Sequence, residues 1–221
     1  MVKGKKFELD FKTPIHRRKE KQQVELLLQF LESSKNYCVC IVDLVDSTNI
    51  AMGMSNEKIG RYYGVFLNLM GEIASRFGAT VIKNIGDSLL YYFPKTDSDS
   101  AESFKDVLKC SMTMIKKRPE INARLHQEGL PDVNYRISCE YGSVIVAKMS
   151  TSLVNDIFGN SVNLCSKINL VASPNGVVIG KGLYQKTKSF NEYVFREVKN
   201  TQIIFGTNYR VYSVSNKMRS L

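Results

Sequence analysis

A run of apolar residues that ends in a single aspartate limits how this chain can fold. Residues 37–42 read Tyr-Cys-Val-Cys-Ile-Val, and Asp43 follows them directly. A continuous apolar run of this length is typical of a strand that is covered on both faces. A carboxylate at the end of such a strand is costly to bury unless it is paired or bound to a cation. The sequence therefore predicts a central strand that holds a charged group at its carboxyl end.

The segments after this strand alternate between the periodicities of helices and strands. The expected order is a strand at 37–42, a helix at about 47–77, a hairpin at 80–93, a helix at 101–126 and a hairpin at 135–147. We expect Asp46-Ser47-Thr48 to cap the first helix and the second hairpin to turn around Gly142. This β-α-β-β-α-β order predicts an α/β (α+β) fold with a ferredoxin-like sheet and helices on one face. Additional C-terminal elements are expected, namely a helix at about 161–170 and strands near 177–179, 192–198 and 209–214.

The N-terminal part of the chain is basic. Residues 1–22 hold eight Lys or Arg against three Asp or Glu, which is half of the net charge of +10. The apolar spacing over 15–33 predicts a helix that packs on the domain or pairs with its copy in a dimer. We assign 1–35 to this basic arm and helix, 36–215 to one folded domain and 216–221 to a tail. The arm is expected to be solvated, with contact to an anionic lipid, nucleic acid or partner as the alternative.

Composition narrows the class of protein. The hydrophobic fraction of 43% and the charged fraction of 24% are ordinary for a globular domain. No apolar run approaches the roughly 18 residues that span a bilayer, and no apolar stretch follows the basic start as in a secretory signal. We therefore expect no membrane span and a cytoplasmic location. The five cysteines are odd in number and most lie in apolar segments, which predicts buried, reduced thiols.

Two aspartates are the first candidates for chemistry. In a ferredoxin-like sheet the first strand lies beside the hairpin, so Asp43 and Asp87 can converge. Two close carboxylates repel each other, which favours a bound divalent cation. The alternative is that Asp43 caps the following helix and Asp87 forms an Asx-turn, and geometry alone does not separate the two.

Three motifs in register resemble the class III adenylate/guanylate cyclase catalytic domains. They are Val-Asp-Leu-Val-Asp-Ser-Thr at 42–48, Lys-Asn-Ile-Gly-Asp at 83–87 and Asp-Ile-Phe-Gly-Asn-Ser-Val-Asn at 156–163. Arg-Ile-Ser at 136–138 and Tyr-Gly-Ser-Val-Ile at 141–145 are similar to the family's fourth and fifth strands. The resemblance covers roughly 36–215. It implies a nucleotidyl cyclase, which closes a nucleoside triphosphate into a 3′,5′-cyclic monophosphate and pyrophosphate.

The resemblance also implies cofactors and partners. Asp43 and Asp87 match the aspartates that bind two Mg²⁺ or Mn²⁺ ions per active site, with the Leu44 carbonyl as a further ligand. Backbone N–H groups in the turn 44–48, as far as Thr48, would cradle phosphate oxygens. In the family the site forms between two chains, so a homodimer with shared active sites is expected. Metal residues come from one chain, and base and ribose residues come from the other.

The remaining matched positions concern the nucleoside. Lys83 and Asp156 match the two base-reading positions, and Asn163 matches the asparagine that orients the ribose. Adenine presents an acceptor at N1 and a donor at N6, which Lys83 and Asp156 can satisfy, whereas guanine reverses this pattern. ATP is therefore the expected substrate. Cytosine presents the same pattern at N3 and N4, so CTP stays open.

Three departures from the family pattern support rival readings. Lys167 stands one turn after Asn163, where the family usually carries an arginine that stabilises charge on the α-phosphoryl group. The segment 203–208 lacks the lysine that often holds the terminal phosphates, and Asp46 replaces a common glycine. A degenerate domain that binds nucleotide without cyclising it is the main rival. A polymerase-like palm that binds nucleic acid ranks below it, because half of the excess charge lies in the arm.

Overall fold

The computed structural model describes residues 28–30, 34–149, 155–199 and 209–217. Its strands are β1 (Leu28–Phe30), β2 (Lys35–Leu44), β3 (Thr80–Ile85), β4 (Ser88–Phe93), β5 (Tyr135–Met149), β6 (Asp156–Phe158), β7 (Val177–Gly180), β8 (Tyr193–Glu197) and β9 (Val211–Asn216). Its helices are α2 (Ser47–Met52), α3 (Asn56–Arg76), the 3₁₀ turn η1 (Pro94–Ser98), α4 (Ala101–Gln127), α5 (Asn160–Asn169) and α6 (Lys181–Thr187).

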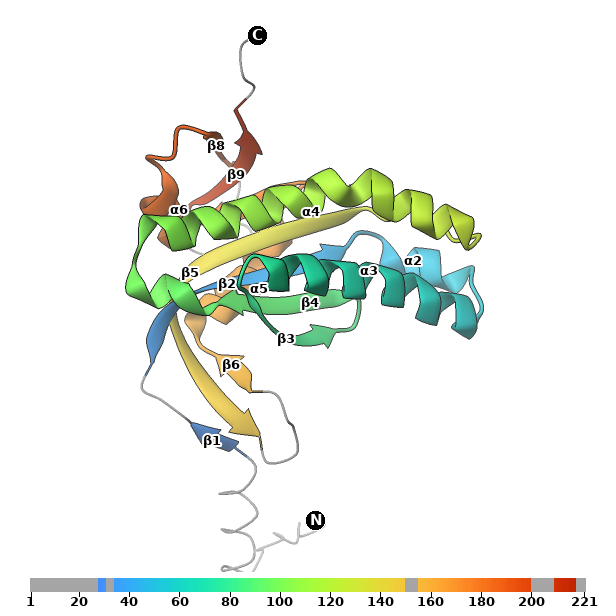
Figure 1. The fold of residues 1–221 in the computed structure, drawn as a ribbon, viewed down its shortest axis with the longest axis horizontal. Helices are drawn as coiled ribbons and strands as arrows, with labels where there is room; N and C mark the ends of the chain where they lie inside the picture. The colour runs from blue at the N-terminus through green and yellow to red at the C-terminus, as the bar shows by residue number, and fades with distance from the viewer. Residues whose placement is uncertain (1–27, 31–33, 150–154, 200–208, 218–221) are drawn as a thin grey trace, which may run out of the picture.

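The strands form one sheet with the order β3-β4-β2-β5-β7-β9-β8. Neighbouring strands along this path run antiparallel except β5 and β7, which are parallel. The predicted β-α-β-β-α-β order is confirmed by β2, α3, β3, β4, α4 and β5. The far end of β5 extends away from the helices, and there β1 and β6 pair with it (Figure 1).

The two faces of the sheet carry different layers. Helices α3 and α4 lie over one face (Figure 1), where Tyr62 and Phe104 pack against β2 residues Cys38, Cys40 and Val42. The alternate β2 residues, Val39 and Ile41, contact the layer that contains α5. This alternation follows from the two-residue repeat of a strand. It explains why β2 is apolar throughout, since both of its faces are covered.

The predicted hairpin around Gly142 is wrong, because β5 runs through this position without turning. Gly142 stays in the ladder opposite Tyr37. A Cβ atom at Gly142 would lie 2.6 Å from the Ser161 hydroxyl oxygen. The glycine therefore lets α5 approach the sheet, a requirement of packing that resembles a turn signal in the sequence.

The predicted single helix at 47–77 is also wrong, because the chain forms α2 and then α3. Asp46 does not cap α2 through its side chain and has a left-handed φ of 58°. The cap of α3 is Ser55, whose hydroxyl oxygen accepts from the Lys58 amide at 3.4 Å. In the N-terminal segment, Leu28–Phe30 is a strand and not part of the predicted helix. The rest of that prediction lies outside the described residues.

All five cysteines are buried and free, which confirms the expectation of reduced thiols. Burial raises the pKa of Cys40 and Cys165 well above the usual range, so both thiols stay protonated. Within the part of the chain that is described, no helix combines the length and apolarity that crossing a membrane requires.

Candidate active site

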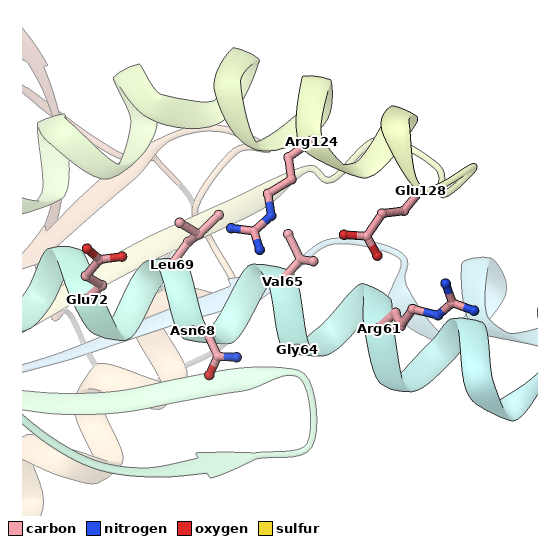
Figure 2. Close-up of a pocket in the computed structure, with 8 residues that line it drawn as sticks. All are labelled: Arg61, Gly64, Val65, Asn68, Leu69, Glu72, Arg124 and Glu128. Atoms are coloured by element: carbon pink, nitrogen blue, oxygen red, sulfur yellow. The ribbon is translucent and has the colours of Figure 1, made fainter.

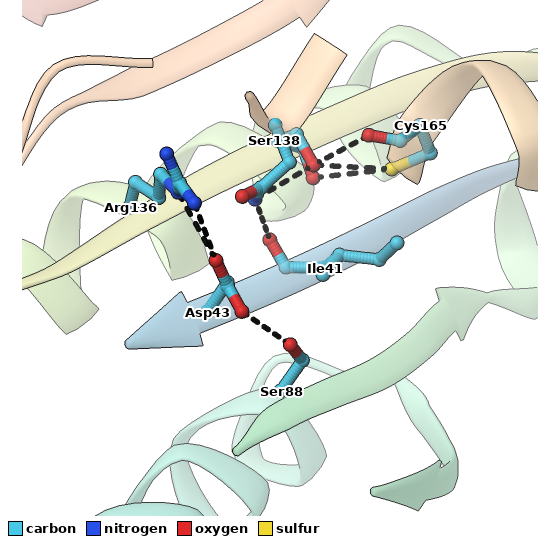
Figure 3. Close-up of polar contacts among 7 residues, drawn as sticks. Ile41, Asp43, Ser88, Arg136, Ser138 and Cys165 are labelled. Carbon is cyan, nitrogen blue, oxygen red and sulfur yellow. Dashed lines mark hydrogen bonds and ion pairs between the residues drawn. The ribbon is translucent and has the colours of Figure 1, made fainter. Parts of the chain in front are cut away.

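Asp43 lies at the carboxyl end of β2 between two polar neighbours. In the ladders it stands opposite Ser88 of β4 and Arg136 of β5. Both Nε and Nη2 of Arg136 lie 3.0 Å from Oδ2 of Asp43, and the Ser88 hydroxyl donates to Oδ1 (Figure 3). The side chains of Asp43 and Arg136 are only 17% and 24% exposed. The predicted buried carboxylate is therefore paired with a cation from the adjacent strand.

Asp87 is the sequence neighbour of Ser88, which donates to Asp43. It directly precedes Ser88 in the turn between β3 and β4, where Gly86 has a left-handed φ of 62° that favours glycine. The Asp87 side chain is half-buried. Because Ser88 pairs with Asp43, the register brings Asp87 to within one residue of the strand position opposite Asp43. The convergence of the two aspartates on one cation stays a prediction.

The donors at this place suit a hard divalent cation. Carboxylate and carbonyl oxygens are the ligands that Mg²⁺ prefers, and Mg²⁺ commonly keeps only one or two protein carboxylates beside water and phosphate. The described residues hold no group of three or more His, Cys, Asp and Glu placed to bind a metal. Asp43 already stabilises one cation, the Arg136 guanidinium. The pair of aspartates therefore fits a metal whose other ligands come from a carbonyl, water and substrate.

The turn after β2 contributes fewer free amides than the sequence analysis expected. The Val45 amide donates to the Asn134 carbonyl at 2.8 Å. Leu44 is buried, while Thr48 is exposed in the first turn of α2. Asp46 is exposed between them. The Val45 amide of the predicted phosphate cradle is therefore already hydrogen-bonded within the protein.

The two candidate base-reading residues meet at the edge of the sheet. Lys83 of β3 and Asp156 of β6 are far apart in sequence, yet Nζ lies 2.5 Å from Oδ2. Lys83 is 47% exposed and Asp156 is 10% exposed. The other carboxylate oxygen of Asp156 accepts from the Ile157 amide at 2.8 Å. The carboxylate is therefore fixed, whereas the lysine has an open approach from solvent.

Asn163 and Lys167 lie one turn apart on α5, and both are exposed. Among the described residues, neither forms a hydrogen bond or ion pair with Asp43, Asp87 or the Lys83–Asp156 pair. The candidates therefore lie in three separate places. Asp43 and its partners form one, the Lys83–Asp156 pair forms the second, and the exposed face of α5 with Asn163 and Lys167 forms the third.

Buried polar bonds hold α5 near Asp43. The Asn169 amide nitrogen donates to the Ile41 carbonyl at 3.3 Å and to the Ser138 hydroxyl at 3.1 Å. Ser138 in turn donates to the Cys165 carbonyl at 2.9 Å (Figure 3). Ile41 is two residues before Asp43 on β2. This bond to Ile41 links the placement of α5 to that of β2, the strand that carries Asp43.

Sequence reasoning missed Arg136 and Ser88 as parts of the site. Asp43 ends one apolar strand, and Arg136 lies near the start of another. Antiparallel pairing brings such residues to the same edge of a sheet. The signal in the sequence is a basic residue near the start of an apolar strand, but only the register of β2 with β5 pairs it with Asp43.

The groove between α3 and α4 is separate from these clusters. It has a volume of about 270 Å³, with Val65 and Leu69 between the charged residues Arg61, Arg124 and Glu128 (Figure 2). None of the candidate site residues lines it.

Curated proteins that are similar in sequence to this chain are nucleotide cyclases. The chain is 23% identical over 145 residues to an adenylate cyclase of Streptomyces coelicolor, covering 66% of this chain and 32% of the relative. It is 24% identical over 162 residues to a cytidylate cyclase of Staphylococcus aureus, covering 69% and 38% of the two chains. The match thus spans about a third of the length of these relatives.

Solved structures share the fold. The adenylyl cyclase CyaB from P. aeruginosa superposes with a TM-score of 0.74 at 20% identity, covering 86% of this chain and all of that one. The guanylate cyclase domain from Catenaria anguillulae in complex with GTP gives 0.70 at 18% identity, with 85% and 100% coverage. The adenylate and guanylate cyclase catalytic domain family matches residues 30–216. The chain belongs to this family of class III cyclase catalytic domains.

Proposed function

We propose that the chain converts ATP into 3′,5′-cyclic AMP and pyrophosphate. The observation that carries the choice of base is the contact between Lys83 and Asp156, which places one donor and one acceptor 2.5 Å apart. Adenine needs this combination, because its N1 accepts and its N6 amino group donates. Guanine would leave both protein groups unpaired, and for the buried Asp156 carboxylate this costs about 1–3 kcal/mol.

Asp43 and Asp87 would hold two Mg²⁺ or Mn²⁺ ions, with the Leu44 carbonyl as a further ligand. Bound divalent cations lower the pKa of the ribose 3′-hydroxyl and neutralise the leaving pyrophosphate. Asn163 would orient the ribose through its amide. The Lys167 ammonium would stabilise charge on the α-phosphoryl group, although without the planar fork of an arginine. Thr48 and its backbone amide would contact phosphate oxygens.

A homodimer with shared sites is part of the proposal. Asn163 and Lys167 are exposed and make no contact with the aspartate cluster of their own chain. A second copy in a two-fold arrangement can present these side chains to that cluster, and the same contact then occurs twice. Each site would combine Asp43 and Asp87 of one protomer with the α5 face and the base-reading pair of its partner.

The second candidate is a cyclase that acts on CTP. Cytosine offers an acceptor at N3 beside a donor at N4, so it satisfies the same two side chains. The relative from Staphylococcus aureus is a cytidylate cyclase, which favours keeping this reading beside the first. A regulatory domain that only binds nucleotide is the third, supported by Lys167 and by the absence of a basic residue at 203–208.

The test is an incubation of the purified protein with ATP, GTP, CTP and UTP separately, in Mn²⁺ and in Mg²⁺. Products are identified by mass spectrometry. Cyclic AMP is expected as the main product, and a different cyclic nucleotide would overturn the base argument alone. Binding of ATP without any cyclic product would favour the regulatory reading. The Asp43→Asn variant is the matched control, because it should form no product while it keeps the shape of the side chain.

A further inference from the structure

We propose that Arg136 is an internal cation that keeps the metal site closed to free divalent metal. The proposal rests on the metal-binding role proposed above for Asp43. A guanidinium from the adjacent strand contacts the carboxylate that would bind the metal.

Both carboxylate oxygens of Asp43 are engaged, but only Oδ2 contacts Arg136. Oδ2 of Asp43 receives two N–H groups of the same guanidinium, each at 3.0 Å. Oδ1 receives the Ser88 hydroxyl (Figure 3). A cation that approached Oδ1 would come close to the positive charge on Oδ2. Since this edge is largely shielded from water, the repulsion is screened less than on an open surface.

Arg136 is also poorly placed to move away. It belongs to β5, which lies between β2 and β7 inside the sheet. The contact involves Nε as well as Nη2, so two nitrogens of the planar guanidinium hold its orientation. Lys83 provides a contrast, because it meets Asp156 through the tip of a flexible chain that is 47% exposed. The guanidinium thus competes with metal as a fixed group, not as a mobile counter-ion.

A consequence follows for the order of binding. If free metal displaced the guanidinium, an arginine that is three-quarters buried would lose its anionic partner, which is unfavourable. Metal that arrives together with a polyanion brings a replacement charge to the same place. We therefore expect free Mn²⁺ to bind weakly to the resting protein because Arg136 is present.

The experiment measures the dissociation constant of free Mn²⁺ by electron paramagnetic resonance, without nucleotide, on the full chain. Arg136→Gln removes the charge and keeps much of the bulk of the side chain. This variant should bind Mn²⁺ at least about tenfold more tightly than the unaltered protein. Arg61→Gln removes an equal charge from the exposed surface of α3 and controls for net charge.

The possible outcomes distinguish the proposed role of Arg136 from the proposed role of Asp43 as a metal ligand. Equal Mn²⁺ affinity in Arg136→Gln and the unaltered protein would overturn the role of Arg136 and leave the cyclase proposal intact. Tight Mn²⁺ binding that persists in the double variant Arg136→Gln/Asp43→Asn would overturn the assignment of Asp43 instead. If Arg136→Gln does not fold, Arg136→Lys replaces it. Its ammonium sits on a flexible stem, so an intermediate affinity is expected, and an unchanged one contradicts the proposal.

Discussion

Two ion pairs occupy the candidate site, and they differ in how firmly they are held. Asp43 and Arg136 join adjacent strands inside the sheet, and their side chains are 17% and 24% exposed. Lys83 and Asp156 join the edge strand β3 to the short strand β6, and the lysine is 47% exposed. The first pair uses a planar fork that is held through two nitrogens. The second uses the tip of a flexible stem.

The difference indicates which half of the site opens more easily. An exposed lysine pair contributes little to stability, so a base edge can part Lys83 from Asp156 at small cost. Parting Asp43 from Arg136 leaves a charge with less access to water and costs more. We infer that the proposed base-reading half is ready for substrate, whereas the proposed metal half opens only when a polyanion replaces Asp43 as the partner of Arg136.

The largest expected effect comes from removing the carboxylate of the firmer pair. Asp43→Asn should reduce cyclic nucleotide formation on the order of 1,000-fold or more, because an amide is a poor metal ligand. Product is measured by mass spectrometry, with circular dichroism to confirm the fold. The matched change Asp97→Asn, in the exposed pair with Lys35, should leave the rate unchanged. Substantial activity in Asp43→Asn would contradict the metal assignment.

A third carboxylate, without any cation, sharpens the comparison. Glu140 of β5 is 2% exposed and accepts from the Tyr209 hydroxyl at 2.7 Å and the Gly182 amide at 3.1 Å. Among the described residues it has no ion-pair partner, and burial raises its pKa from 4.5 to about 7. A raised pKa means that the folded chain holds the proton after the unfolded chain has lost it. Stability from this group is therefore greatest below pH 4.5 and falls until about pH 7.

Glu140→Gln should remove the loss of folding stability that the Glu140 carboxyl causes as pH rises. The variant should gain up to about 3 kcal/mol over the unaltered protein as pH rises from 4.5 to 7.5. Chemical unfolding at several pH values measures the difference, which cancels the titration of the other groups. A difference that stayed constant with pH would show that the Glu140 carboxyl does not titrate in this window.

The next prediction concerns substitutions in the Lys83–Asp156 pair. Lys83→Glu combined with Asp156→Asn reverses the donor and acceptor, which should lower kcat/KM for ATP by about 10–100-fold. The same double variant should raise the relative rate with GTP, because guanine donates at N1 and accepts at O6. Assays with both nucleotides in parallel give the ratio. A ratio that does not move would indicate that these side chains do not touch the base.

The smallest effect is expected on α5. Lys167→Arg restores a planar fork at the position proposed to face the α-phosphoryl group and should raise kcat by several-fold, about 1 kcal/mol. Lys188→Arg, in the exposed turn after α6, serves as the control. A fall in kcat, or an equal rise in the control, would argue against a role for Lys167 in the reaction.

The sequence predicted the core order of strands and helices because the periodicities of β2, α3 and α4 are long and regular. It failed where packing decides the local structure. Gly142 resembled a turn but lies inside β5, since its missing side chain makes room for Ser161. The break between α2 and α3 at Gly53 was hidden by apolar residues on both sides.

The site was predicted in part for a similar reason. Asp43, Asp87, Lys83 and Asp156 belong to contiguous motifs, so matched positions located them. The partner of Asp43 could not be found in this way, because Arg136 reaches it only through the register of β2 with β5. Register depends on every side chain along both strands, and no local pattern reports it.

The most direct test of the account is complementation between two impaired variants. Asp43→Asn removes the proposed metal half, and Asp156→Asn impairs the proposed base-reading half. Alone, Asp43→Asn should form almost no product, and Asp156→Asn should lose about 10–100-fold in activity with ATP. When they are mixed and allowed to exchange subunits, activity should return, because each heterodimer keeps one site with both halves intact. If heterodimers form, as native mass spectrometry can verify, and no activity returns, then the two halves do not come from different chains and the shared-site account is wrong.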